Sequence, residues 1–319
     1  MLARFFSRPQ INHPIVLVIM ALVFTSWTLL WVPIHPQTFD LWGSPVIMPG
    51  IGGYVIGGAM WVFIALFWQF LGKQHQFVQD HYFWPVMIVV LGVVFLPSPN
   101  YLTFTQHFGG FALLAGLFIH RRDGQQMYFS MFDLGLFIGL WVLFSPLTII
   151  WIVLMWIGLL VFGFPPLRSF ILLLVGAFIT LFLTATVIQT IVFFGGDALT
   201  MQTLYSRLTA ETTETPVYMG IALALLLLYI APEIYRSVTR SSVLKRQLAG
   251  WGIICLLLLV PSLGFFGLKP EFTAPLILFS SLFLANRFAF NKSKRRELMF
   301  YLFMLVVLLY PVGVYLLVG

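Results

Sequence analysis

The first polar segment of the chain carries a candidate catalytic carboxylate. It reads WVPIHPQTFDLWGSPVIMPG at positions 31–50 and contains His35 and Asp40 among four prolines. A proline-restrained segment at a membrane surface could present Asp40 as a general base. The same pattern is typical of a proline-rich turn in which Asp40 caps a short helix. We favour the turn as the commoner case and keep Asp40 as the catalytic candidate.

His107 is the second candidate, in the segment NYLTFTQHFGG. It lies just inside the outer end of an apolar run, and a histidine within a membrane usually faces the protein interior or a wet cavity. His107 could cooperate with Asp40 across a shared outer pocket. A hydrogen bond that packs two helices near Gly109 and Gly110 explains it equally well, so both interpretations stay open.

Arg207 could hold a lipid phosphate, because a guanidinium matches phosphate oxygens in a bidentate way. Its segment, 195–215, predicts a short helix on the membrane surface with Asp197 as N-cap. A pair with Glu211 one turn later is the structural alternative, and we favour it slightly. The helix is indicated by apolar residues spaced i, i+3, i+4, i+7: Met201, Leu204, Tyr205 and Leu208.

The sequence contains no phosphate-binding glycine loop with a lysine, no HExxH, no GxSxG and no paired cysteines. The six histidines are scattered, and Cys255 is the only cysteine. We therefore expect no metal site, no cofactor and no internal disulfide, with Cys255 in the core.

The composition requires a lipid environment. Hydrophobic residues make up 61% of the 319 residues and charged residues only 8%, against about 25% charged in soluble domains. The net charge of +7 does not indicate nucleic-acid binding, because basic residues in multi-pass proteins mark cytoplasmic loops. The bilayer is the expected partner, and nucleic acid is excluded.

The elements that would position these residues are apolar helices. Spanning segments must be helices or closed barrels, and these runs are too long and uniform for barrel strands. We predict an all-α, polytopic helical membrane protein with a single transmembrane domain over 1–319 and an uncleaved first helix. The eleven predicted spans are 14–33, 51–72, 82–97, 101–120, 127–144, 147–164, 168–194, 216–231, 249–267, 273–286 and 297–317.

The basic residues predict the orientation. With the N-terminus in the cytoplasm and the C-terminus outside, only Arg207 and Lys269 of the 17 basic residues fall outside. Such asymmetry follows the positive-inside rule in a bacterial inner membrane. The cytoplasmic set is Arg4, Arg8, Lys73, Arg121, Arg122, Arg168, Arg236, Arg240, Lys245, Arg246, Arg287, Lys292, Lys294, Arg295 and Arg296.

Asp133 opens the apolar run FDLGLFIGLWVLFSP at positions 132–146. Six residues into its span, or about 9 Å at ~1.5 Å per residue, it lies within reach of the headgroups and of Arg121 or Arg122. We predict a structural role, in which Asp133 anchors a hairpin of the segments 127–144 and 147–164. Ser145-Pro146 would form its outer turn.

The N-terminal MLARFF, this FDLG…SP stretch and the following PPLRSF…G turn resemble an uncharacterised bacterial family of polytopic inner-membrane proteins. The resemblance covers most of the chain and implies no activity. A more distant resemblance is to the C-type membrane glycosyltransferases and related lipid-linked sugar polymerases. It implies a carboxylate in the first outer loop, which Asp40 matches, but a second outer acid is missing from PSPN at 97–100.

Three functions follow from these features. The poverty of chemical groups favours a non-catalytic component of a cell-envelope assembly, with other envelope membrane proteins as partners. The alternative is a glycosyltransferase- or polymerase-like enzyme acting on polyprenyl-phosphate sugars, with Asp40 as base and His107 with Arg207 on phosphate. A transporter is third, because no internal repeat is visible and Asp133 alone is an acid within a span.

Overall fold

A computed structural model describes residues 13–31, 37–41, 44–48, 51–74, 83–94, 101–120, 127–193, 217–240, 243–266, 269–290 and 293–318. Each predicted span corresponds to one α-helix in these ranges, so the helical class is confirmed. The eleven helices are α2 (His13–Trp31), α3 (Ile51–Gln74), α4 (Phe83–Val94), α5 (Tyr101–His120), α6 (Met127–Phe144), α7 (Ile150–Val161), α8 (Pro166–Phe193), α10 (Val217–Arg240), α11 (Val243–Phe266), α12 (Pro270–Phe290) and α13 (Ser293–Val318).

Several of these helices have the length and composition of membrane spans. Among the described residues, four stretches are long and apolar enough to cross a bilayer: Pro14–Trp31, Ile51–Gln74, Tyr101–His120 and Leu167–Val187. The shorter apolar helices are Phe83–Gly92, Met131–Leu143, Leu147–Val161 and Glu297–Gly313. A membrane protein is the class that this set of apolar helices suggests, and the number of crossings stays a prediction.

The first polar segment contains a β-hairpin. Strands β1 (Gln37–Leu41) and β2 (Ser44–Met48) pair antiparallel, with Asp40 opposite Pro45. Asp40 therefore lies in a strand. The favoured prediction, that it caps a short helix, is wrong. Threonine, phenylalanine, valine and isoleucine in the two segments are strand formers. Strand β1 packs against α5 and α3.

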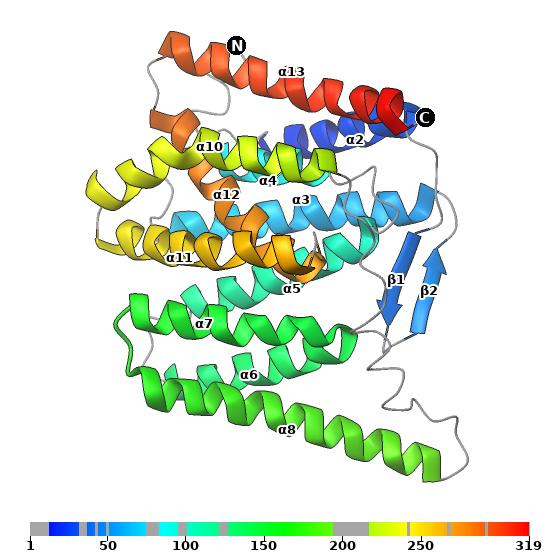
Figure 1. Cartoon of the computed structure of the whole chain (residues 1–319), viewed down its shortest axis with the longest axis vertical. Helices are drawn as coiled ribbons and strands as arrows, with labels where there is room; N and C mark the ends of the chain where they lie inside the picture. The colour runs from blue at the N-terminus through cyan, green and yellow to red at the C-terminus, as the bar shows by residue number, and fades with distance from the viewer. Residues whose placement is uncertain are drawn as a thin grey trace.

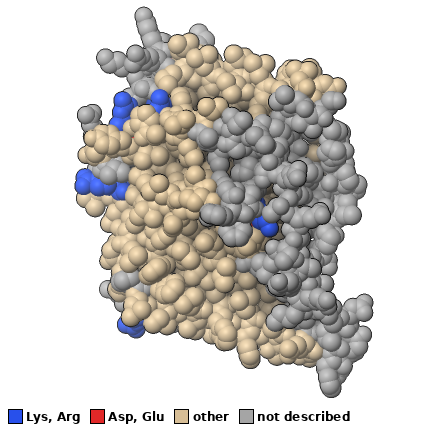
Figure 2. Space-filling view, in the orientation of Figure 1, with Lys and Arg blue, Asp and Glu red and all other residues tan. Residues whose placement is uncertain are grey.

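Successive helices run in opposite directions, and the hairpin lies across one end of the bundle (Figure 1). We call this the hairpin end and the other the basic end. Lys269, just before α12, is the only cation at the hairpin end among the described side chains. Figure 2 shows lysine and arginine side chains along the opposite edge of the molecule. The described cations at the basic end are Lys73, Arg168, Arg236, Lys245, Arg246 and Arg287.

Helices α4, α5 and α12 form the centre of the bundle. Residues 83–92, 101–112 and 271–285 are buried throughout, and α12 packs against both α4 and α5. Tryptophans tie this centre together, because a buried indole N–H needs an acceptor. Trp84 Nε1 donates to Ser281 Oγ at 3.1 Å and Trp61 Nε1 to Thr105 Oγ1 at 3.0 Å. These bonds satisfy polar groups between helices away from water.

Helix α6 packs most closely on α8. A Cβ added at Gly135 would lie 2.1 Å from the carbonyl oxygen of Leu173, and one at Gly176 would lie 2.3 Å from that of Phe132. Small residues at such a spacing let two membrane helices touch at the backbone. The segments 127–144 and 147–164 follow one another through the turn at Ser145-Pro146, and α6 contacts α8 more closely than it contacts α7.

The chain turns between α7 and α8 at Gly163, whose φ of 75° suits glycine. The N–H of Phe164 bonds the carbonyl of Leu159 at 3.0 Å and closes the end of α7. Pro166 then begins α8, where its missing N–H has no cost. The short turn brings α8 back beside α6.

Helices α10 and α11 extend furthest beyond their predicted spans at the basic end. Helix α10 continues to Arg240 and α11 begins at Val243, so most of the predicted inner loop 232–248 is helical. Glu233 supports the extension, because its Oε2 lies 3.8 Å from Nη1 of Arg236 one turn later.

Candidate functional site

His107 lies near the hairpin end of α5 and is 1% exposed. Its Nδ1 is 2.9 Å from the backbone carbonyl oxygen of Thr103, one turn earlier. A carbonyl can only accept a hydrogen bond, so Nδ1 carries the proton and donates it. In a neutral imidazole this leaves a lone pair on Nε2.

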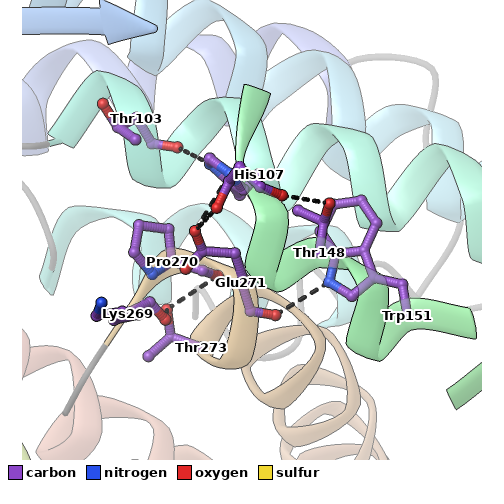
Figure 3. A network of polar contacts seen from close by, with 9 residues as sticks. Thr103, His107, Thr148, Trp151, Lys269, Pro270, Glu271 and Thr273 are labelled. Atoms are coloured by element: carbon purple, nitrogen blue, oxygen red, sulfur yellow. Dashed lines mark hydrogen bonds and ion pairs between the residues drawn. The ribbon is translucent and has the colours of Figure 1, made fainter. Parts of the chain in front are cut away.

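Glu271 faces His107 from the first turn of α12 and is 5% exposed. Its Oε1 lies 3.8 Å from Nε2 of His107. Figure 3 shows the two side chains directed at one another between their helices.

Pro275 explains how the backbone of Glu271 is held. A proline within a helix has no N–H for the carbonyl four residues earlier, which here belongs to Glu271. Trp151 of α7 supplies the missing donor, with Nε1 at 3.0 Å from this carbonyl oxygen. The bond connects α7 to the start of α12 and satisfies a group that would otherwise be buried without a partner.

Ser145 joins Glu271 to the turn between α6 and α7. Its Oγ donates a hydrogen bond to Glu271 Oε1. The carbonyl oxygen of Ser145 accepts from Thr148 Oγ1 at 2.7 Å and from Thr148 N at 3.1 Å, which fixes the turn that becomes the 3₁₀ helix η2 (Pro146–Ile149). The prediction of a turn at Ser145-Pro146 is confirmed, and its serine belongs to the site.

Hydrogen bonds from Thr273 to the residue before the helix fix the first turn of α12. The carbonyl of Lys269 accepts from Thr273 Oγ1 and from Thr273 N, both at 3.1 Å. This turn is drawn below the pair in Figure 3. The site thus joins three parts of the chain: α5, the α6–α7 turn with α7, and the N-terminus of α12.

Two atoms of the pair lack hydrogen-bond partners among the described residues. These are Nε2 of His107 and Oε2 of Glu271. A buried polar atom without a partner costs free energy. Within the described ranges no group of three or more metal-ligand side chains occurs.

The hydrogen bonds of Ser145, His107 and Glu271 differ from those of a serine nucleophile triad. In a serine triad the imidazole takes the proton of the serine hydroxyl, and a carboxylate orients the imidazole. Here Ser145 bonds Glu271, and His107 bonds Thr103. His107 is therefore not the hydrogen-bond partner of the Ser145 hydroxyl, as the imidazole of a serine triad would be.

A second polar cluster occupies the basic end. Glu233, 2% exposed, lies beside Arg236 on α10, and the guanidinium carbon of Arg287 on α12 is 4.1 Å from the ring centroid of Tyr229. The cation–π contact holds α10 against α12. Helix α12 thus carries a paired ionisable residue near each of its ends.

The structure places the other predicted residues as follows. Asp40 is on β1, beside the helix that carries His107, but its side chain lies outside the described residues, as do Arg121, Arg122 and Arg207. Asp133 is described and exposed on α6.

Sequence reasoning found His107 and missed Glu271 and Ser145. Glu271 was not among the candidate residues, and Ser145 was named only as part of a turn. The signal that could have found Glu271 is its spacing of four residues before Pro275 in KPEFTAP, since that spacing frees its carbonyl.

Compared with protein-family models, with curated proteins and with solved structures, the chain matches none of them. The class rests on the fold alone, a bundle of apolar helices of the kind found in membranes.

Proposed function

We propose that the chain is a non-catalytic, multi-pass component of a bacterial cell-envelope assembly. In this proposal it sits in the inner membrane with eleven spans, the N-terminus in the cytoplasm and the C-terminus outside. Membership of the uncharacterised family of inner-membrane proteins belongs to the same proposal.

The observation that carries it is the enclosure of His107 and Glu271, which are 1% and 5% exposed. Their partners come from three separate parts of the chain, and their contacts hold those parts together. Burying such a pair costs desolvation free energy, and its contacts fix the relative positions of the segments that carry it. This suits a structural connection more than turnover of a substrate.

The outer faces of the bundle offer the surface that such a component would use. Phe178 and Phe182 on α8 are 67% and 60% exposed and stack at 6.2 Å between ring centroids. Helix α8 contacts α6 and α7 and turns its other apolar faces outward, toward lipid or another membrane protein.

The test compares function per folded molecule in a deletion strain. Asp40→Asn, His107→Gln and Arg207→Gln should complement in proportion to the amount of folded protein. Phe178→Leu with Phe182→Leu keeps an apolar surface and should lower complementation at normal protein amount. Loss of function in Asp40→Asn with undiminished folded protein, and full function in the α8 variant, would overturn the proposal.

A second candidate is a glycosyltransferase- or polymerase-like enzyme that uses polyprenyl-phosphate sugars at the outer face. The observation that favours it is the contact between β1, which carries Asp40, and α5, which carries His107. An acid and a histidine near one membrane surface could share general acid–base work.

This candidate predicts a change in surface glycans. Asp40→Asn in a deletion strain should abolish a surface polysaccharide or glycoprotein glycan that the wild-type gene restores. The matched control is Asp133→Asn, at an exposed carboxylate on α6, which should leave the amount of glycan per protein molecule unchanged. Unchanged glycans with full complementation by Asp40→Asn would end this candidate.

A further inference from the structure

We propose that His107 and Glu271 together form a binding site for one proton inside the bundle. The ligand is H⁺, taken up either by Nε2 of His107 or by the carboxyl group of Glu271, whose Oε1 lies 3.8 Å from that nitrogen. The inference stands on the geometry of the pair, whichever proposed function is correct.

The first step is the tautomer of His107. Thr103 O accepts from Nδ1 at 2.9 Å, so the proton of a neutral ring is on Nδ1 and the lone pair is on Nε2. Edge-on contact with the Trp151 ring, at 6.3 Å between centroids and 80° between planes, limits the ring orientation.

The second step is the meeting of Nε2 with a carboxyl group. Glu271 Oε1 is 3.8 Å away, and without an added proton a lone pair of nitrogen would face those of a carboxylate. The site would then hold a net negative charge in a buried place, with the Ser145 hydroxyl as its hydrogen-bond donor. Such a charge is expensive to bury.

One added proton removes the conflict. It gives either an imidazolium beside a carboxylate or a neutral imidazole beside a carboxylic acid, and both arrangements leave the site electrically neutral. In the first arrangement the proton is on Nε2, which lacks a hydrogen-bond partner among the described residues. No covalent bond between heavy atoms changes, and the proton comes from water.

The charged and titratable neighbours do not substitute for this proton. Among the described contacts no ion pair joins the Lys269 ammonium to Glu271. The other groups on the packed elements, in α10, the start of α11 and the C-terminal part of α12, are at the basic end. Within the described ranges, the other titratable and charged residues at the hairpin end are Asp40 on β1, Tyr54 on α3, Tyr101 on α5, Lys269 before α12, and Tyr310 and Tyr315 on α13.

Proton binding would be linked to packing. The pair connects α5 with the start of α12, and Ser145 connects the same carboxyl group with the α6–α7 turn. Loss of the proton would leave an unpaired charge among these elements and would weaken their contact. The site therefore makes the junction of the three elements sensitive to protonation.

The experiment uses the full-length protein in lipid nanodiscs, with ¹⁵N-labelled histidine rings and infrared detection of the Glu271 carboxyl group. A variant with the other five histidines replaced by glutamine leaves His107 as the only labelled ring. At neutral pH we expect either both His107 nitrogens protonated, or Nδ1 protonated with a Glu271 carboxylic acid. A neutral His107 beside an ionised Glu271 would overturn the proposal.

Glu271→Gln supplies the second arm, because an amide can donate to Nε2 without an added proton. We expect His107 in this variant to be the neutral Nδ1–H form, and the infrared signal of the Glu271 carboxyl group to be lost. Asp133→Asn is the control and should change neither signal. An imidazolium that persists unchanged in Glu271→Gln would also contradict the proposal, and if this variant does not fold, the wild-type spectra decide.

Discussion

Single residues at the hairpin end have structural tasks that follow from their chemistry. Trp151 bonds a carbonyl that Pro275 leaves without its helical donor, and Ser145 bonds the carboxyl group of the same residue, Glu271. Each bond satisfies a buried group of one segment with a donor from another, which makes the junction of α7 and α12 specific.

The substitution Asp133→Asn tests the role of a single exposed residue. Asp133 is exposed near the start of α6, away from the His107–Glu271 pair. Because its predicted role is structural, Asp133→Asn should lower protein abundance more than activity per molecule. Quantitative immunoblotting of membranes, together with complementation normalised to protein amount, measures both. Normal abundance with reduced function would assign Asp133 a functional role instead.

At the scale of elements, the backbone contact of α6 and α8 depends on glycine. A Cβ at Gly139 would lie 2.7 Å from the carbonyl oxygen of Ala177, and Thr180 Oγ1 donates to the Leu136 carbonyl at 3.2 Å across the same contact. The two helices cannot separate to admit a larger side chain without losing this bond.

Gly139→Leu should therefore destabilise the protein by roughly 1–3 kcal/mol, the usual cost of overpacking. Gly52→Ala is the matched control, because nothing lies within 4 Å of the added Cβ on α3. Its stability should be unchanged or slightly raised, since alanine favours helix more than glycine does. Thermal unfolding in detergent measures both variants, and equal stabilities would contradict the close contact of α6 with α8.

The sequence predicted where the helices lie better than which helices pack against one another. Long apolar runs define where helices lie, and the ends of α5 and α6 agree with the predicted segments at 101–120 and 127–144. Partner choice depends on contacts between distant segments. Gly176 meets α6 only after the turn at Gly163, and periodicity within one segment contains no such information.

The dependence on contacts between distant segments also explains why the sequence predicted only one residue of the His107–Glu271 pair. His107 stood out because a histidine in an apolar run is uncommon. Glu271 lies 164 positions later, and only the packing of α12 on α5 brings it to His107. The strands β1 and β2 were missed because the prolines of this segment suggested a turn, although its threonine and branched residues also favour strands.

The whole molecule has a polar asymmetry that suits a bilayer. Of the described cationic side chains, Lys269 is at the hairpin end and the others are at the basic end. With basic residues retained in the cytoplasm, the hairpin end would face outward. The proton site would then lie nearer the outer surface than the cytoplasm.

Orientation can be tested with single cysteines on a Cys255→Ala background. Lys269→Cys should react with a membrane-impermeant thiol reagent added from outside, in cells whose outer membrane is opened. Arg168→Cys, exposed at the start of α8, should react only after the inner membrane is permeabilised. The reverse pattern would invert the predicted topology.

A double-mutant cycle of His107 and Glu271 tests the central claim, which is that these two residues are joined inside the bundle. His107→Phe or Glu271→Met alone leaves a buried polar partner and should cost about 3 kcal/mol or more of unfolding free energy. The double variant, measured by denaturant unfolding in detergent, should cost less than the sum of the two by at least ~1 kcal/mol. Effects that add to within ~0.5 kcal/mol would contradict the claim.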